Sequence, residues 1–469
     1  MTRPLPGFFH AIFARGLGRN TAFALAQSLI TLASMLLVYR VLIAYQGLAA
    51  LGLWSLLTMF SGIATAFDVS GASALARSVA RHENEFFERT PTPIIHTVLI
   101  TSLAINGVLL LLLLALAAAL LPHLVEPAQL AQAWELVPWV AGLMLVNPLA
   151  VGLTSSIDGL MRADQRAMLM SAAALIGAIT AVALIPNVGV VGIAIAQAIQ
   201  QMIVIGGAWT LLRWHVDDFG WIPRHWKRTI FRQTTAYAVK MNVVGVLGLL
   251  FEPVTKYCLT LSGGTTALGA YELAARLVVQ LRNLAVSSTV PLVPVLAGIS
   301  ENENHRLATV LTRAQRLIVP AALGVALMSL LATPIMCLII LGHFSMTVLR
   351  MGALLTWGWS INLIALPLYL VAQAQGQLRW NIASHALIGL TVVATTAIAP
   401  RGEPLYIVTG IAAGLAAGAL CAITGNAVAF GVTQVVARWP AIAGVVAIVT
   451  MACTATFAMA PALASIRVG

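Results

Sequence analysis

The sequence predicts an all-α protein that crosses a membrane many times. The chain has 469 residues, of which 60% are hydrophobic and only 9% charged, whereas about a quarter of the residues are charged in soluble domains. Its mean hydropathy is +0.94. Roughly a dozen apolar stretches reach the length of about 20 residues that lets a helix cross a hydrocarbon core. The alternating ten-residue segments typical of membrane strands do not occur in the sequence.

Thirteen apolar stretches are predicted to span the membrane. They cover residues 20–43, 50–78, 94–121, 134–158, 167–185, 190–212, 234–261, 266–297, 317–341, 350–373, 381–399, 406–433 and 440–463. The preceding segment, 1–19, contains three arginines and several phenylalanines, which predicts a basic segment at the cytoplasmic membrane surface.

Lys and Arg residues are unevenly distributed among the predicted loops. The loops after even-numbered spans contain them, whereas the loops near 122–133, 186–189 and 262–265 contain none. Because positive loops stay in the cytoplasm, this bias predicts a cytoplasmic N-terminus. The same preference explains the net charge of +11, and the scattered basic residues do not predict nucleic-acid binding.

An internal repeat divides the predicted spans into two groups of six. Two pairs of segments match at an offset of 217 residues and a third pair at 218: 50–54 with 267–271, 158–162 with 375–379, and 190–194 with 408–412. Six is an even number, so both groups enter the membrane in the same orientation, as in parallel-repeat transporters.

The repeat predicts two six-helix bundles around a central cleft. The expected segments are an N-terminal bundle at 20–212, a cytoplasmic linker at 213–233, a C-terminal bundle at 234–433 and a probable extra transmembrane helix at 440–463. Two similar bundles facing a cleft suit alternating access, with the substrate bound between them.

Four charges in the seventh and eighth spans are predicted to form one network. At a rise of about 1.5 Å per residue, Lys256 lies level with Glu272, and Glu252 lies level with Arg276. Each helix also carries its own pair at four-residue spacing. The network either pins the two helices together or lines the cleft, where it would bind an anionic head group or exchange partners.

Other intramembrane residues are candidates because charge within a span is costly and marks function. Arg282 lies near mid-span and is the foremost candidate for substrate contact. Lys240 is a weaker candidate because its side chain can snorkel to the cytoplasmic interface. Asp68 is a candidate for ion coupling. His385 is either a packing residue or part of a proton path.

No catalytic or cofactor motif is found in the sequence. It has no phosphate-binding GxxxxGK[ST] loop, no HExxH pair and no Ser/His/Asp set, so we expect neither an enzyme nor a cofactor. The four cysteines, without paired spacing, predict packing roles and no metal site. Four aromatic residues could stack on sugar rings or serve as packing and interface residues: Trp54, Trp357, Trp359 and Tyr369.

Several stretches together resemble the polysaccharide transporter (O-antigen flippase) branch of the multidrug/oligosaccharidyl-lipid/polysaccharide exporter superfamily. In the first span they are Asn20 at its start and Tyr39-Arg40 at its end, followed by Gly47 and the G-x-W of Gly52 and Trp54. The second span ends with the run FDVSGASALARSVAR, and the eighth span contains the run GAYELAARLVVQLRNLAVSSTVPLVPVLA. The family commonly has an Asp-aliphatic-Gly run where this chain has FDVSG, which weakens any role for Asp68.

The resemblance implies a flippase of the bacterial inner membrane. Its substrate would be an undecaprenyl-pyrophosphate-linked oligosaccharide, moved from the cytoplasmic to the periplasmic leaflet. Proton or sodium coupling and neighbouring glycan polymerases and glycosyltransferases are also implied. The lipid II flippase branch is similar too, but generally has fourteen helices.

Three alternatives remain open at this point. A cationic-drug antiporter of the same superfamily would need an anionic cleft. A major-facilitator carrier also has paired six-helix bundles, and DGLMRADQR, residues 158–166, faintly resembles its loop signature, although after the fourth span instead of the second. A membrane scaffold in glycan assembly would tolerate Arg282→Ala.

Overall fold

The computed structural model is helical throughout the part of the chain that it describes. It describes residues 15–67, 71–72, 75–82, 88–287, 304–400, 402–432 and 439–465, with side chains except at 15–22, 65–67, 237, 240–247, 287, 304–306 and 439–441. No strand occurs among these residues. The prediction of an all-α protein is confirmed.

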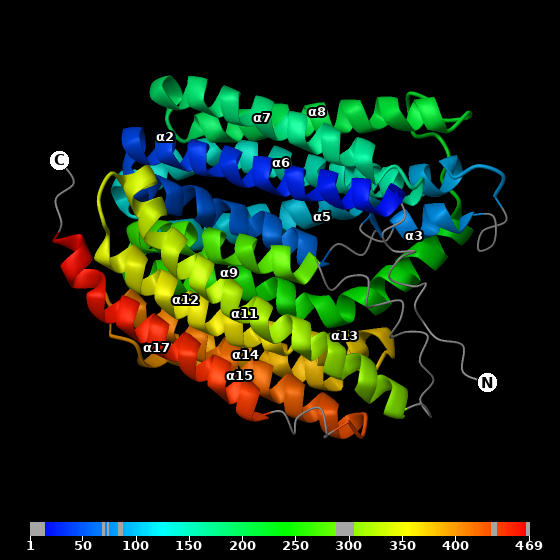
Figure 1. Ribbon diagram of the computed structural model, residues 1–469. Helices are drawn as coiled ribbons and strands as arrows, with labels where there is room; N and C mark the ends of the chain where they lie inside the picture. Colours follow the sequence, from blue (N-terminus) through cyan, green and yellow to red (C-terminus); the bar gives the residue numbers. More distant parts are fainter. Residues whose placement is uncertain are drawn as a thin grey trace. The chain divides into compact units, whose positions relative to one another are not determined.

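The first six predicted spans lie in five long helices (Figure 1). These are α2 (Arg15–Phe67), which contains two spans, α5 (Thr92–Leu124), α6 (Pro127–Gly159), α7 (Ala163–Val188) and α8 (Val191–His215). The second span does not continue to residue 78 as predicted, because α2 ends at Phe67 and a short helix, α3, covers Leu75–Ala80.

The remaining predicted spans follow the same pattern. They lie in α9 (Arg228–Ser287), which contains two spans, α11 (Asn304–Leu341), α12 (Met346–Ile364), α13 (Leu366–Ala374), α14 (Arg379–Ile398), α15 (Pro404–Ala429) and α17 (Trp439–Ala464). The span predicted at 350–373 is divided between α12 and α13, which meet at a bend of 48°. Pro367 causes the break by depriving α13 of a backbone donor in its first turn.

Length and composition qualify most of these helices as membrane spans. Among the described residues, nine helices are long and apolar enough to cross a membrane, or ten if the bent pair α12 and α13 counts as one span. This count is lower than thirteen because α2 counts once and α9, which includes residues 237 and 240–247 outside the described side chains, is not included. The C-terminal helix qualifies over Ile442–Ala464.

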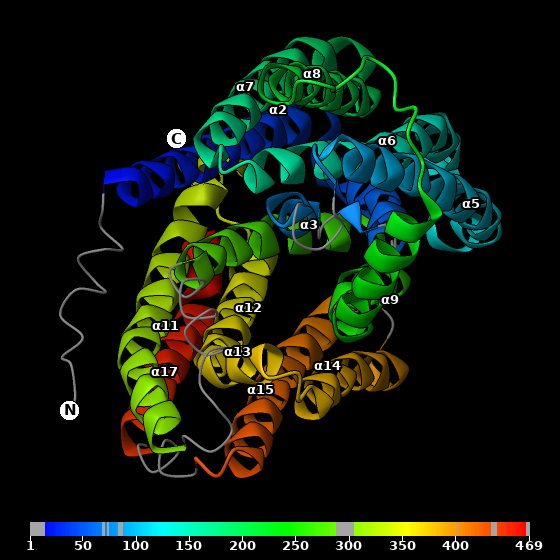
Figure 2. The same ribbon diagram turned by 90° about the vertical axis from the view of Figure 1, so that its right-hand side faces the viewer.

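The chain forms two compact units that are not continuous in sequence. Unit 1 contains Met1–Tyr45, Ala64–Leu121 and Leu130–Val243, and unit 2 contains Gln46–Ile63, Pro122–Gln129 and Val244–Gly469. In unit 1, α7 and α8 lie side by side (Figure 2). Leu75 of α3, Ile94 of α5, Ile157 of α6 and Leu212 of α8 share one buried cluster in this unit.

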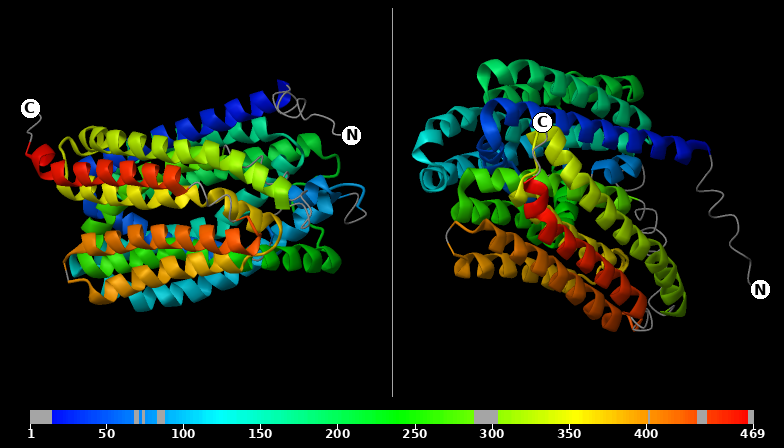
Figure 3. Two further views of the ribbon diagram at one scale, coloured as in Figure 1. Left: turned by 60° about the horizontal axis from the view of Figure 1, so that its bottom comes forward. Right: turned by 60° about the vertical axis from the view of Figure 1, so that its left-hand side comes forward.

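In unit 2, α12 occupies a central position. It packs against α11, α15 and α17, while α14 packs along α15 (Figures 2 and 3). Glycines allow these close approaches: a Cβ atom at Gly358 of α12 would lie 2.8 Å from the Cα atom of Ala412, and one at Gly418 of α15 would lie 3.0 Å from the Ser384 oxygen. Small residues at helix contacts are typical of membrane bundles.

Two glycines at the repeat offset separate the joined spans. Gly47 of α2 has φ 77° and Gly264 of α9 has φ 68°, a left-handed conformation that glycine adopts without penalty. The two residues are 217 positions apart, the offset that the sequence matches define. The loops predicted between these spans are therefore tight turns at one glycine each.

The backbones of the two repeats also contact one another within unit 2. A Cβ atom at Gly52 would overlap the Thr265 carbonyl oxygen, and one at Gly269 would overlap the Leu48 carbonyl oxygen. Residues 48 and 265, like 52 and 269, are 217 positions apart. The contact is thus reciprocal, as expected where equivalent segments cross at a twofold axis.

Candidate functional site

The four predicted charges of α9 form one ion-pair network. Lys256 Nζ lies 2.8 Å from Glu252 Oε1 and 3.7 Å from Glu272 Oε2. Arg276 Nη2 lies 3.6 Å from Glu252 Oε1, and Arg276 Nε donates to Glu272 Oε1. The pairs are arranged symmetrically about the turn at Gly264, so the two arms of α9 run side by side in opposite directions. The predicted contacts are confirmed.

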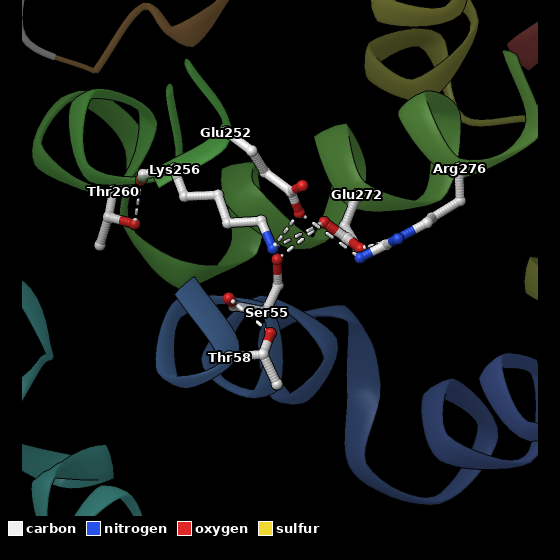
Figure 4. Close-up of polar contacts among 7 residues, drawn as sticks. All are labelled: Ser55, Thr58, Glu252, Lys256, Thr260, Glu272 and Arg276. Carbon is white, nitrogen blue, oxygen red and sulfur yellow. Dashed lines mark hydrogen bonds and ion pairs between the residues drawn. The ribbon is translucent and has the colours of Figure 1, made fainter. Parts of the chain in front are cut away.

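A serine of the first repeat completes the network (Figure 4). Ser55 Oγ donates a hydrogen bond of 2.7 Å to Glu272 Oε2, and both residues are buried. Ser55 is also the residue 217 positions before Glu272. The equivalent positions of the two repeats therefore meet in one polar contact inside unit 2, next to the Gly52 and Gly269 crossing.

The network has a buried half and an accessible half. The side chains of Lys256 and Glu272 are 2% and 4% exposed, whereas those of Glu252 and Arg276 are 57% and 41% exposed. The ammonium group of Lys256 is fully engaged by carboxylates in this conformation. Arg276 and Glu252 are thus accessible at the surface of the network, whereas Lys256 is enclosed by its partners.

Burial makes the network sensitive to the loss of either buried charge, Lys256 or Glu272. Two positive and two negative groups cancel, and each buried charge has an opposite charge within 4 Å. Removing one of these two buried charges leaves the other with only its half-exposed partner, and breaking a buried ion pair costs about 3–5 kcal/mol. This explains how an otherwise apolar hairpin accommodates four charges.

Arg282 lies in a second cluster of unit 2, formed with aromatic side chains. Its guanidinium carbon lies 4.5 Å from the ring centre of Trp359 on α12. Its Nε atom is buried without a hydrogen-bond partner, and Nη1 has a long contact of 3.5 Å with Asn283 Oδ1. No carboxylate of the described residues pairs with it, so within this part of the chain its positive charge is not neutralised.

Three further rings complete this cation–aromatic cluster, which we define as Arg282, Phe251, Trp359, Tyr369 and His385. Phe251 of α9 lies edge-on to Trp359 at 6.2 Å between ring centres. Tyr369 Oη of α13 lies 3.1 Å from His385 Nε2 of α14. All five residues are partly exposed. The cluster combines a cation with aromatic faces and polar edges.

Buried amides hold the tyrosine of the cluster. Asn381 Nδ2 donates to the Tyr369 carbonyl oxygen at 3.1 Å, and Asn426 Nδ2 donates to Asn381 Oδ1 at 2.9 Å. Both asparagines are fully buried. Neither asparagine was predicted from the sequence, although a polar amide within an apolar span is a usable signal for a buried hydrogen bond.

The other predicted site residues are not placed by the structure. Asp68 lies outside the described residues, as does the side chain of Lys240, although its backbone belongs to α9. Ion coupling at Asp68 and substrate contact at Lys240 therefore remain predictions. Among the described residues, no three His, Cys, Asp or Glu side chains converge as metal ligands.

Solved structures of other proteins have the same fold as this chain. Three solved structures illustrate the shared fold. A multidrug resistance MATE family transporter of the MOP superfamily, in an inward-facing conformation, is 13% identical, with a TM-score of 0.64 over 87% of this chain and 99% of that chain. The lipid II flippase MurJ, in an inward closed conformation, is 14% identical, with a TM-score of 0.63 over 93% and 98%.

A MOP superfamily transporter from Pyrococcus furiosus is 14% identical, with a TM-score of 0.57 over 89% and 94%. The binding pocket of that transporter has a reversed polarity, which suggests a different function for it. The chain therefore has the fold of this superfamily of helical membrane transporters and flippases.

The family is shown by the sequence itself. Residues 17–300, more than half of the chain, match the family described as polysaccharide biosynthesis protein, and the chain belongs to that family. No curated protein matches the sequence significantly. The family resemblance drawn from the residues is confirmed.

Proposed function

We propose that this protein is a flippase for undecaprenyl-pyrophosphate-linked oligosaccharides, the repeat units of O-antigen, capsule or exopolysaccharide. It moves them from the cytoplasmic to the periplasmic leaflet of the bacterial inner membrane by alternating access between its two repeats. Its membership of the polysaccharide biosynthesis family and its likeness to a lipid II flippase support this function.

The observation that carries the proposal is the unneutralised charge of Arg282. A pyrophosphate group is a dianion and needs a cationic partner in a site of low dielectric constant. Arginine binds phosphate oxygens through two parallel hydrogen bonds and stacks on aromatic rings. Arg282 lies over Trp359 with its Nε atom unpaired, so its hydrogen-bonding capacity is available to an anion.

The aromatic rings of the cluster suit the sugar attached to that anion. Trp359 and Phe251 offer apolar faces, and Tyr369 offers a hydroxyl group. A sugar ring that stacks on such faces would be held beside the pyrophosphate. The prenyl chain would remain in the surrounding lipid.

The ion-pair network has two possible roles in this function. It is either a neutral structural pin of the α9 hairpin, or a set of charges that exchanges partners when the substrate pathway opens. Arg276 is the network cation that a head group can reach, because 41% of its side chain is exposed. Lys256 would join only if Glu252 or Glu272 released it.

A cationic-drug antiporter of the same superfamily is the second candidate, because MATE transporters share the fold. It would need an unpaired carboxylate where the drug binds. The acidic residues of the α9 hairpin, Glu252 and Glu272, are both paired with Lys256 and Arg276. A scaffold for glycan polymerases and glycosyltransferases is the remaining alternative.

A reconstituted transport assay tests the proposal. A labelled lipid-linked oligosaccharide is placed in vesicles, and its movement between leaflets is followed with wild-type protein and with Arg282→Ala. We expect the variant to move the lipid at least tenfold more slowly while it remains folded. Wild-type rates in Arg282→Ala would contradict the proposal and favour a scaffold.

Arg350→Ala is the matched control for this assay. Arg350 also belongs to unit 2, lies over an aromatic ring (4.9 Å from the centre of Phe457) and has a buried, unpaired Nε atom. It is not part of the cation–aromatic cluster. Transport in Arg350→Ala should therefore remain close to the wild-type rate.

A further inference from the structure

His385 lies within the cation–aromatic cluster, where it faces a permanent cation and no carboxylate of the residues that the structure describes. Of the described residues, Arg282 on α9 and Tyr369 on α13 are the charged and titratable groups that act on its ring. Trp359 on α12 and the Asn381–Asn426 pair of α14 and α15 contribute no charge to the surroundings.

The hydrogen bond of His385 is compatible with either protonation state. Its Nε2 atom lies 3.1 Å from Tyr369 Oη. A phenol hydroxyl donates to a neutral imidazole nitrogen and accepts from a protonated one. Nδ1 makes no hydrogen bond with the described residues.

The position of the ring is fixed by close packing. A Cβ atom at Gly248 of α9 would lie 3.1 Å from His385 Cε1, so the glycine allows the ring to lie against the helix backbone. Tyr369, which meets the ring edge-on at 5.8 Å between centres, holds its other side. The imidazole therefore stays beside Arg282 and is not free to turn toward bulk solvent.

We propose that His385 is a second ligand of the pyrophosphate group and binds it in the protonated form, so that anion binding at Arg282 is accompanied by uptake of a proton. This inference rests on the proposed function and adds a residue and a proton to the site. It assigns to His385 a role in binding instead of packing.

The physical reason is electrostatic. In the empty cluster, a protonated His385 would be repelled by Arg282, and no carboxylate of the described residues offsets the repulsion. A dianion between the two groups reverses the balance, because it attracts both cations. The ligand and the proton therefore each strengthen the binding of the other, by the reciprocity that linkage requires.

The inference also constrains energy coupling. A proton that binds together with the substrate travels in the same direction as the substrate. It cannot serve as the counter-ion of an antiport cycle. An inward flow of protons or sodium that drives export would have to use another residue, and Asp68 is the candidate that the sequence offers.

Calorimetry measures the proton directly. A short-chain isoprenyl pyrophosphate is titrated into the purified full-length protein near pH 7, in two buffers of different ionisation enthalpy. Wild type should take up as much as one proton more per bound ligand than His385→Gln, while ionisation of the ligand itself cancels between the two. The wild-type affinity should also fall more steeply with rising pH, by up to tenfold more per pH unit.

His343→Gln is the matched control, since His343 lies in the exposed connection between α11 and α12. It should show the wild-type proton uptake. Gly248→Ala tests the same inference without removing the imidazole: the added methyl group displaces the ring and should also reduce proton uptake. This variant replaces His385→Gln if the latter does not fold.

The outcomes separate the inference from the proposed function. If Arg282→Ala abolishes binding but the His385 and Gly248 variants take up protons like wild type, the inference is overturned and the proposed function stands. If Arg282→Ala binds the pyrophosphate like wild type, the proposed function itself is overturned. Loss of proton uptake in both variants, with binding retained, supports the inference.

Discussion

The turn at Gly47 and the turn at Gly264 have the same backbone and different chemistry. Both glycines have a positive φ, and both turns lead into a segment that crosses the other repeat at Gly52 or Gly269. Among the residues with described side chains, ion pairs flank the turn of the second repeat and not that of the first. Both repeats have thus retained the glycine turn and the helix crossing that follows it. The four charged residues that flank the turn at Gly264 have no charged counterparts in the first repeat.

The equivalent positions of the first repeat make this asymmetry explicit. At an offset of 217 residues, the counterparts of the four network charges are Met35, Tyr39, Ser55 and Met59. None of them is charged. Ser55 takes part in the network, as a hydrogen-bond donor to Glu272. The first repeat therefore supplies a neutral partner to the charges of the second.

The largest expected effect is the loss of a buried charge on the second hairpin. Glu272→Ala leaves the ammonium group of Lys256 buried with a single carboxylate partner, and we expect a loss of about 3–5 kcal/mol in the free energy of unfolding. Equilibrium unfolding in detergent measures it. The apolar double variant Lys256→Met/Glu272→Leu should recover most of this loss.

Glu135→Ala is the control for that experiment. Glu135 is exposed on α6, and surface substitutions usually change stability by less than about 0.5 kcal/mol. A comparable loss in Glu135→Ala would mean that carboxylate removal in general is destabilising. The particular role of the α9 network would then be contradicted.

The glycine crossing should respond equally from both sides. Gly52→Ala and Gly269→Ala each place a methyl group against a carbonyl of the other repeat, and overpacking of this kind costs about 1–3 kcal/mol. Thermal unfolding of both variants checks this. Gly107→Ala, where an added Cβ meets nothing within 4 Å, should not be destabilised. A clearly unequal response would argue against a twofold crossing.

The smallest effect is expected at the accessible end of the network. Glu252→Gln retains the shape of a side chain that is 57% exposed, and Lys256 keeps Glu272 as a partner. Exposed ion pairs contribute about 0–1 kcal/mol, so the melting temperature should change little. A loss as large as that of Glu272→Ala would show that the network acts as one unit.

The sequence predicts the α9 network because its determinants are local. All four charges flank a single turn, so helical rise alone indicates which residues are level. The role of Ser55 could not be predicted in the same way, because its partner is 217 residues distant. The repeat offset nevertheless provides a signal, since it pairs position 55 with position 272.

The cation–aromatic cluster shows the limit of such reasoning. Arg282, Trp359, Tyr369 and His385 each attract attention as polar or aromatic residues within spans. Their four helices, however, come together through tertiary packing, which helical spacing does not determine. The bend between α12 and α13, which helps to position Tyr369, lies at Pro367. Several prolines lie within the predicted spans, and the sequence alone does not show which of them bends its helix.

The neutrality of the α9 network has a consequence for the response to membrane voltage. Moving one elementary charge through the field of an energised membrane involves about 2.3 kcal/mol per 100 mV. The two cations and two carboxylates of the hairpin move together when the hairpin moves, so they carry no net current. Among the described charges of unit 2, a charge without a carboxylate partner, such as that of Arg282, would respond to the membrane potential when it moves across the membrane.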